Sequence, residues 1–286
     1  MSNPIIFIHY NNSNYLAYSL WQAKNSNKNT DVILLGDDSN NNYSFINHIK
    51  VNHSKSVEEF NKVYKHMSSN PYEYELFCIQ RWFILRDFMI QYNIDKCYYQ
   101  DSDVMLYVDT NKGEFNWFDL GFFGGFSGHT TFINNLNALD DFCTFIMDCY
   151  IDKSRLKRLE NIYQDFLEKN LPGGICDMTL IDHYCAQSHY TIYDLEKVVN
   201  DATFDHNINV VQGYENWFGR KKLYRTSNGI FCKNTALNRY IKFNSLHFQG
   251  DAKMFMKYFA EQINDERDEP LAFDYSCCQW IKADGW

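Results

Sequence analysis

The chain has 286 residues, a length that fits one large domain or one domain of two lobes. Its composition, 45% hydrophobic and 17% aromatic, supplies enough core-forming side chains to exclude a disordered or collagen-like chain. The formal net charge of -9 excludes binding to nucleic acid or an anionic membrane through a broad basic surface. A phosphate-bearing ligand would therefore have to be held locally, by a metal ion or a few placed cations.

The cysteines and the apolar stretches narrow the class further. The nine Cys residues form no CxxC pair, and the first residues lack the pattern of a secretory signal, so we expect reduced thiols and a cytoplasmic location. The apolar stretches are short, and the one candidate for a membrane span, 74–92, carries Arg81, Arg86 and Asp87 in its middle. Three charges there exclude a transmembrane helix.

The first part of the chain alternates apolar strands with helices. Residues 5–8 and 32–35 are short apolar runs rich in β-branched side chains, and the spacing of apolar residues over 15–24 predicts a helix between them. A weaker strand is predicted at 48–51, followed by an amphipathic helix at 57–66. Strands that are apolar throughout are typical of a parallel sheet covered on both faces.

The clearest helix prediction covers 74–91, where apolar residues recur every three or four positions. Residues 93–95 then form a turn, and 96–100 form the next strand. That strand delivers Asp101 and Asp103 to its carboxyl end, which is the edge of an open α/β sheet at which ligands bind.

The second half of the chain is richer in Gly and aromatic loops. Helices are predicted at 134–149 and 154–168, and a further helix opens at Asp177. An edge strand is predicted at 190–193. The remainder is expected to consist of short strands and loops, up to a strand at 241–246.

The Asp101-Ser102-Asp103 motif is the first feature that points to chemistry. Two carboxylates about 4 Å apart repel by roughly 4 kcal/mol at an effective dielectric near 20, so such a pair favours a bound cation. A hard divalent ion held by one or two carboxylates, with phosphate oxygens completing its shell, is a common solution. A solvated turn can hold the same three residues, and it is the position at a strand end that favours a functional role.

The segment from His247 to Lys253, with the sequence HFQGDAK, supplies complementary groups: an imidazole, a Gly that permits close backbone approach, and a cation for a diphosphate. Together with the Asp-Ser-Asp motif, it resembles the metal and diphosphate site of GT-A fold glycosyltransferases. It is most similar to the glycosyltransferase family 8 type, whose C-terminal motif is His-Phe-x-Gly-x-x-Lys.

The resemblance implies a metal-dependent hexosyltransferase that moves a sugar from a nucleotide-sugar, most simply a UDP-hexose, to a glycan or other hydroxyl acceptor. It implies that Asp101, Asp103 and His247 bind Mn²⁺ or Mg²⁺, and that Gly250 and Lys253 contact the diphosphate. In such a transfer, negative charge grows on the departing diphosphate, which a metal ion and one Lys would stabilise.

The implied fold is an α/β, GT-A-like single domain over 1–286, with a mostly parallel central sheet flanked by helices. Within it, a nucleotide-binding lobe is predicted over 1–109 and an acceptor lobe over 110–286. The C-terminal segment of the second lobe would complete the metal site.

Further nucleotide-sugar contacts are predicted around the sheet. His9, Tyr10 and Asn11 follow the first strand, where this fold receives the base and ribose, and Tyr10 can stack on a nucleobase. Asp37 ends the second strand and can accept from the base or ribose, or can form a plain turn. The resemblance places Arg81 near the nucleotide, and the alternative for Arg81 is a structural ion pair.

Three more residues complete the predicted site. Ser102 is assigned to the nucleotide-sugar together with Asp101, and Gly125 lies in a Gly-rich stretch that can approach the donor sugar or form a tight turn. Asp177 is the candidate base or donor-sugar contact, with a helix N-cap as its alternative role. The Asp-Gln pair of family 8 would fall on Asp177-Met178, where the Gln is missing.

Other functions stay open at this point. A Mg²⁺-dependent phosphatase of the haloacid dehalogenase type also carries Asp-x-Asp after an apolar strand, but Met105 stands where that motif has Thr or Val. A non-catalytic nucleotide-sugar-binding module would keep the same residues. Glycoside hydrolysis uses two carboxylates roughly 5 to 10 Å apart without a metal, which suits the closely spaced Asp pair poorly.

Overall fold

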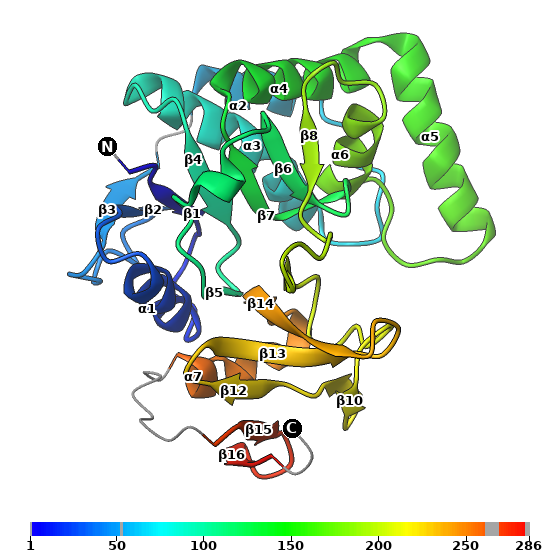
Figure 1. Cartoon of the computed structure of the whole chain (residues 1–286). Helices are drawn as coiled ribbons and strands as arrows, with labels where there is room; N and C mark the ends of the chain where they lie inside the picture. Colours follow the sequence, from blue (N-terminus) through cyan, green and yellow to red (C-terminus); the bar gives the residue numbers. More distant parts are fainter. Residues whose placement is uncertain (1, 52–53, 261–268, 284–286) are drawn as a thin grey trace. The chain divides into compact units, whose positions relative to one another are not determined.

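The computed structural model describes residues 2–51, 54–260 and 269–283. Figure 1 labels the helices and strands along the chain. Two units share the chain, the first made of Met1–His48, Gln100–Asn111 and Leu195–Trp286, and the second of Ile49–Tyr99 and Lys112–Asp194. The units thus interleave along the sequence, whereas the predicted lobes are contiguous. The ligand-binding roles assigned to those lobes stay a prediction.

The first unit begins with a parallel strand pair covered by a helix. Its elements are β1 (Ile5–Ile8), α1 (Leu16–Ser26), β2 (Val32–Gly36), β5 (Val104–Leu106), β9 (Ala202–Phe204), β10 (Asn216–Trp217), β11 (Arg220–Lys221), β12 (Tyr224–Thr226), β13 (Gly229–Asn234), β14 (Arg239–His247), η2 (Gly250–Phe255), α7 (Met256–Phe259), β15 (Leu271–Asp274) and β16 (Gln279–Lys282), and β3 (Asn47–Lys50) spans its boundary with the second unit. β1 pairs in parallel with β2, and every residue of both strands is buried. The predicted β-α-β unit is confirmed.

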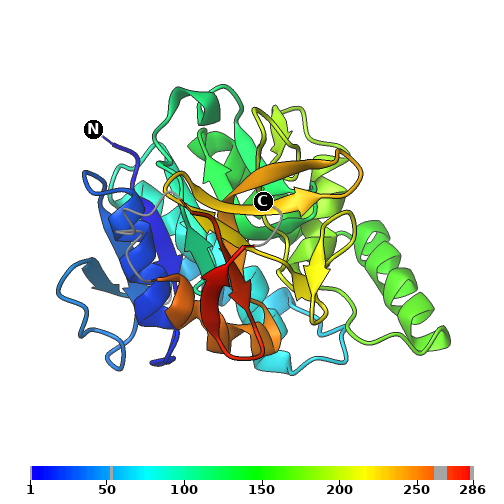
Figure 2. The ribbon, with the colours of Figure 1, turned by 60° about the horizontal axis from the view of Figure 1, so that its bottom comes forward.

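The C-terminal part of the first unit forms an antiparallel sheet. Its strand order is β16-β15-β12-β13-β14-β5, and β9 pairs in parallel with β14. Figure 2 shows β15 and β16 as a red hairpin. Aromatic residues from several of these elements pack into one core, among them Phe243, Phe248, Phe259 and Phe273. The sequence predicted short strands in this region but not their pairing.

The second unit is built around strands covered by helices. Its elements are α2 (Lys55–Val63), α3 (Tyr72–Gln91), β4 (Cys97–Gln100), η1 (Gly113–Phe115), β6 (Leu120–Phe123), β7 (Ser127–Ile133), α4 (Leu136–Ile151), α5 (Lys153–Glu168), α6 (Asp177–Cys185) and β8 (Ile192–Asp194). The strand order is β4-β7-β6-β8, with β6 parallel to β8 and antiparallel to β7. α4 and α6 pack against β7.

Helix α3 is the most deeply buried helix of the second unit's core. It contacts α2, α4 and α6, and for that reason its buried residues extend around most of its circumference rather than along one stripe. Among them are two charged residues, Glu75 and Arg81. A buried charge needs a partner, and Arg81 has one in the candidate site described below.

The fold class is therefore mixed α/β, with a mostly parallel central sheet and flanking helices, as predicted from the sequence. The strands expected at 5–8, 32–35 and 96–100 are present within one residue at each end. Within the described part of the chain, no helix combines the length and apolar character needed to cross a membrane.

We predict that Phe142→Ala lowers the free energy of unfolding by about 3–5 kcal/mol, because the ring is fully buried and its removal leaves a cavity. The ring centroid lies 5.5 Å from that of Trp82 and 5.0 Å from that of Tyr184. Urea denaturation measures the change. Leu167→Ala is the control, since Leu167 is 51% exposed and its truncation should cost about 0.5 kcal/mol or less. Equal losses in the two variants would contradict the assigned core.

Candidate functional site

The two sequence motifs meet because β5 pairs with β14. Asp101, Ser102 and Asp103 form the turn between β4 and β5, and Val104, the first residue of β5, lies opposite His247 at the end of β14. The backbone N–H of Phe248 donates to the carbonyl oxygen of Asp103 at 2.9 Å. The predicted closeness of the Asp motif and the C-terminal segment is thus produced by one antiparallel strand pair.

The carboxylate of Asp103 contacts both basic residues of the C-terminal motif. His247 Nε2 lies 3.4 Å from Oδ1, and Lys253 Nζ lies 3.0 Å from Oδ2. Burial opposes ionisation of Asp103, but the charges and hydrogen bonds of His247 and Lys253 outweigh it and hold its pKa well below the usual range. Asp103 and its two basic neighbours therefore stabilise one another electrostatically in a largely buried cluster.

Asp103 acts in turn on the two bases. Burial alone would lower the pKa of His247 and of Lys253, yet both pKa values are raised, chiefly by Asp103 and more weakly by Asp101. The Lys253 ammonium also lies 5.3 Å from the ring centroid of Tyr15, a favourable cation–π distance. Asp101 thus belongs electrostatically to the same cluster as Asp103.

The imidazole of His247 is oriented by a hydrogen bond from the ring nitrogen that does not face Asp103. Its Nδ1 lies 2.6 Å from the carbonyl oxygen of His206. Because a carbonyl only accepts, Nδ1 carries the proton and donates it, and Nε2 is the nitrogen that faces Asp103. A ring nitrogen fixed by a backbone carbonyl is the usual support of a metal-binding His.

The donor types in this cluster suit a divalent cation. Carboxylate oxygens from Asp101 and Asp103, with one imidazole nitrogen from His247, are ligands that Mn²⁺ accepts. Over residues 2–51, 54–260 and 269–283, however, no group of three or more His, Cys, Asp or Glu side chains is arranged to hold a metal ion. The ammonium of Lys253 instead provides the positive charge beside Asp103.

His9 and Ser102, both predicted to bind the nucleotide-sugar, contact each other. His9 follows β1, and its Nδ1 is hydrogen-bonded to Ser102 Oγ at 2.9 Å, while its Nε2 is hydrogen-bonded to Ser13 Oγ at 3.0 Å. Burial lowers the pKa of His9 in spite of the opposing effect of Asp103 and other nearby carboxylates. The structure therefore joins the loop after β1 to the Asp motif.

Asp37 supports the same loop. Asn11 has a positive φ of 69°, and its backbone N–H donates to Asp37 Oδ2 at 2.7 Å. The amide of Asn40 donates to the carbonyl oxygens of His9 at 2.7 Å and of Asn11 at 3.0 Å. Asp37 therefore has the turn-forming role considered for it, and its contact with a base or ribose, like that of the neighbouring Tyr10, stays a prediction.

Gly250 opens the short helix η2 that carries Lys253. Its φ of 65° lies in the left-handed region, where Gly is favoured over other residues. A Cβ added there would meet no atom within 4 Å, so it is backbone conformation rather than crowding that favours Gly. The backbone beside Lys253 is thus open, as a diphosphate contact would require.

A separate polar cluster lies in the second unit. Arg81 Nη2 is 2.5 Å from Asp177 Oδ2, and both residues are buried. Trp82 Nε1 donates to the same oxygen at 3.3 Å, and Arg81 Nη1 donates to Tyr99 at 3.3 Å. Arg81 therefore forms a structural ion pair, the alternative role considered for it.

Asp177 is the first residue of α6, and the residue in the N-cap position is Cys176. The capping role considered for Asp177 is therefore wrong, since the side chain is turned to Arg81 instead. Gly125 lies in the turn between β6 and β7 with a φ of 71° and no atom within 4 Å of an added Cβ. The roles of Arg81, Gly125 and Asp177 toward a donor sugar stay predictions.

The sequence patterns did not predict the residues that hold the backbone and Nδ1 of His247. Asp205 and His206 directly follow β9, and Lys221 ends β11. Asp205 and His206 reach His247 because β9 pairs in parallel with β14, a pairing that no local pattern predicts, and Lys221 contacts Asp205. A polar Asp-His-Asn run after a short apolar strand is the one signal present in the sequence.

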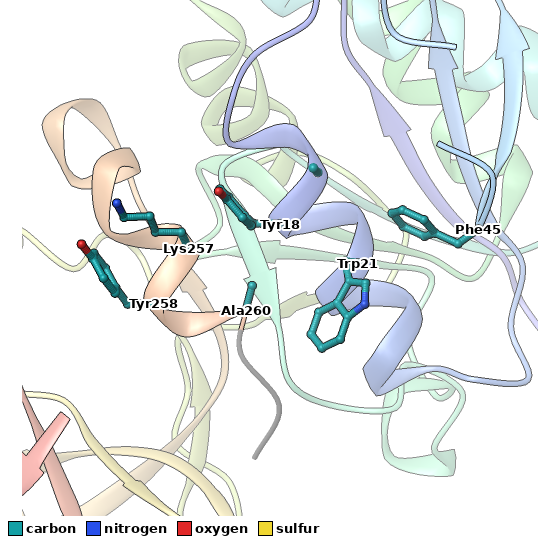
Figure 3. A pocket seen from close by; sticks show the side chains of 7 residues that line it. Tyr18, Trp21, Phe45, Lys257, Tyr258 and Ala260 are labelled. Atoms are coloured by element: carbon teal, nitrogen blue, oxygen red, sulfur yellow. The ribbon is translucent and has the colours of Figure 1, made fainter. Parts of the chain in front are cut away.

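A hollow of about 560 Å³ lies beside α1 and α7 (Figure 3). Tyr18 and Trp21 line it from α1, Lys257 and Tyr258 from α7, and Phe45 from the loop after β2. Its lining residues include one cation and no carboxylate. It therefore lacks the groups for a metal and is not part of the cluster around Asp103.

Several solved structures are similar to this chain. Mouse xyloside xylosyltransferase 1 is 10% identical with a TM-score of 0.49, over 71% of this chain and 87% of that one. An active-site mutant of LgtC is 13% identical with a TM-score of 0.44, over 88% and 89%. The glycosyltransferase GlyE of Streptococcus pneumoniae is 15% identical with a TM-score of 0.36, over 74% and 48%. No protein-family model and no curated protein matches the chain.

We predict that Arg81→Met lowers the free energy of unfolding by about 3–5 kcal/mol, because it leaves the buried Asp177 carboxylate without its cation. Adding Asp177→Asn should recover most of the loss. Arg239→Met is the control, since the Arg239–Asp201 pair has side chains 52% and 57% exposed. Chemical denaturation of the four proteins checks this, and equal losses for Arg81→Met and Arg239→Met would contradict it.

Proposed function

We propose that this protein is a GT-A-type, metal-dependent glycosyltransferase that moves a sugar from a nucleotide-sugar, most simply a UDP-hexose, to a hydroxyl group of a glycan or glycoconjugate. The observation that carries the proposal is the meeting of Asp103 with His247 and Lys253. These are the groups that the sequence motifs assign to a metal and a diphosphate, and they come from segments that lie far apart in the sequence.

Asp101, Asp103 and His247 are the residues that would hold Mn²⁺ or Mg²⁺. The metal, when bound, would supply a Lewis acid for the diphosphate oxygens. The chain supports this choice in two ways: His247 presents Nε2 toward Asp103, and its Nδ1 is already satisfied by His206. Nδ1 can keep its hydrogen bond to the His206 carbonyl while Nε2, in its deprotonated form, would act as the ligand.

Lys253 would neutralise the charge of the departing diphosphate. Its side chain is 32% exposed, whereas that of His247 is 8% exposed, so the ammonium can leave Asp103 more easily than the imidazole can. A charge-assisted hydrogen bond in a partly buried position is worth more than one in water. A protein of net charge -9 has to supply this positive charge locally.

The loops after β1 and β2 would receive the nucleoside. His9 is hydrogen-bonded to Ser102, and Asp37 holds the backbone of Asn11, so these loops are tied to the Asp motif. Tyr10 lies between His9 and Asn11 and would offer its ring to a base. This arrangement favours a ligand that has both a diphosphate and a nucleoside over inorganic phosphate.

The first experiment is a thermal-shift screen of UDP, other nucleoside diphosphates and UDP-sugars, each with and without Mn²⁺. Stabilisation by UDP only in the presence of metal supports the proposal. Stabilisation without sugar transfer or hydrolysis of any donor supports a non-catalytic module. Mg²⁺-dependent hydrolysis of a phosphate monoester without a UDP response supports a phosphatase.

We predict that Asp103→Asn abolishes the Mn²⁺-dependent stabilisation by UDP and the turnover of the donor, because the amide keeps the shape of the side chain but not its charge. Excess EDTA should do the same to the unmodified protein. The control is Asp165→Asn, whose side chain is 66% exposed on α5. Full Mn²⁺-dependent activity in Asp103→Asn would rule out the assigned metal site.

We predict that Lys253→Met weakens UDP binding by roughly 10- to 100-fold, the loss of a hydrogen bond from a charged donor. Calorimetric titration at saturating Mn²⁺ measures the effect. Lys257→Met is the matched control, because it removes the same charge from an exposed position one turn further along the chain. A similar loss in both variants would point to general charge rather than to a contact made by Lys253.

A further inference from the structure

Residues 205–208 hold His247 by three hydrogen bonds. The backbone N–H of His247 donates to Asp205 Oδ2 at 3.1 Å, and its Nδ1 donates to the carbonyl oxygen of His206 at 2.6 Å. The N–H of Ile208 donates to the carbonyl oxygen of His247 at 3.0 Å. The backbone groups and Nδ1 of His247 are all engaged by this segment, and Nε2 is the atom that faces Asp103.

The segment is itself fixed by a buried ion pair. Lys221 Nζ lies 2.7 Å from Asp205 Oδ1, and the two side chains are 3% and 0% exposed. The same ammonium donates to the carbonyl oxygen of Asn207 at 2.7 Å, and it lies 5.3 Å from the ring centroid of Tyr214. Lys221 therefore binds both the side chain and the backbone of the segment that holds His247.

The energetics of a buried ion pair suggest a role beyond stability. The desolvation of two charges offsets most of their attraction, so an apolar pair of similar size is often as stabilising. An apolar pair, however, makes no directional hydrogen bonds. Asp205 accepts from Lys221 with Oδ1 and from the His247 backbone with Oδ2, so it fixes the position of His247 relative to Lys221.

We propose that Asp205 and Lys221 are positioning residues for the proposed metal site: they orient His247 so that its Nε2 faces Asp103 and could bind the cation that Asp101 and Asp103 would hold. This inference rests on the proposed function. Asp205 and Lys221 touch neither metal nor substrate, and act through the backbone of His247 and the carbonyl of His206. Loss of such a supporting contact typically weakens metal binding about 10- to 100-fold.

The test uses the whole 286-residue chain carrying Asp205→Asn together with Lys221→Met, which removes both buried charges at once and leaves neither unpaired. The measurement is the Mn²⁺ concentration that gives half of the UDP-dependent thermal shift, with direct Mn²⁺ binding followed by electron paramagnetic resonance. We expect the half-saturating concentration to rise at least about tenfold. At saturating Mn²⁺, kcat and the KM for the donor should stay near those of the unmodified protein.

The control removes a different ion pair from the same unit. Arg239→Met with Asp201→Asn deletes an exposed pair that includes the first residue of β14, the strand that ends at His247. This variant should bind Mn²⁺ like the unmodified protein. A lower melting temperature with unchanged Mn²⁺ affinity in the Asp205, Lys221 double variant would show a merely structural role and overturn the inference.

Two further outcomes are distinguished by design. If the unmodified protein shows no joint response to Mn²⁺ and UDP, the proposed function fails and this inference fails with it. If the double variant does not fold, Asp205→Glu replaces it, which keeps the charge pair but moves the carboxylate by one methylene, together with ¹⁵N NMR of the His247 ring in metal-free protein. We expect Nδ1 to carry the proton in the unmodified protein. An identical ring signal and Mn²⁺ affinity in Asp205→Glu would overturn the inference.

Discussion

The pairing of β5 with β14 is the constraint on which the candidate site depends. It places Val104 opposite His247, and the turn that precedes β5 therefore carries Asp103 to the imidazole. Backbone hydrogen bonds within a sheet are insensitive to side-chain identity, so the strand pair sets the meeting point and the side chains determine its chemistry. Without this register, the Asp motif and the C-terminal motif would be two unrelated polar segments of a long chain.

Charge compensation explains how an acidic protein can maintain such a cluster. Asp103 is largely buried and would be costly to ionise alone, but His247 and Lys253 contact its two oxygens and favour the charged form. The same carboxylate raises the pKa of both bases. The overall charge of -9 therefore says little about the site, because the charges that stabilise Asp103 lie within a few ångströms of it.

The sequence was sufficient for features with a local signal. β1 and β2 are continuous apolar runs, and the position of Asp101 and Asp103 after an apolar strand was visible without coordinates. Other features depend on which distant segments pair. The Arg81 and Asp177 contact links α3 to α6, and the Asp205 contact with His247 exists because β9 lies along β14. Neither arises from periodicity or spacing, since each needs one partner among many equally plausible carboxylates.

The two basic residues that contact Asp103 are held with different firmness, so they differ in how easily a ligand can displace them. His247 is held from one side by the β5 strand and from the other by residues 205–208, which are anchored in turn by Lys221. Lys253 comes from the short helix η2, and its side chain is about four times as exposed as that of His247, 32% against 8%. A ligand that competes for Asp103 will therefore displace Lys253 before it displaces His247. The imidazole is therefore the more firmly held base and the ammonium the more mobile one, which would suit the proposed function, in which His247 binds a cation and Lys253 follows a departing anion.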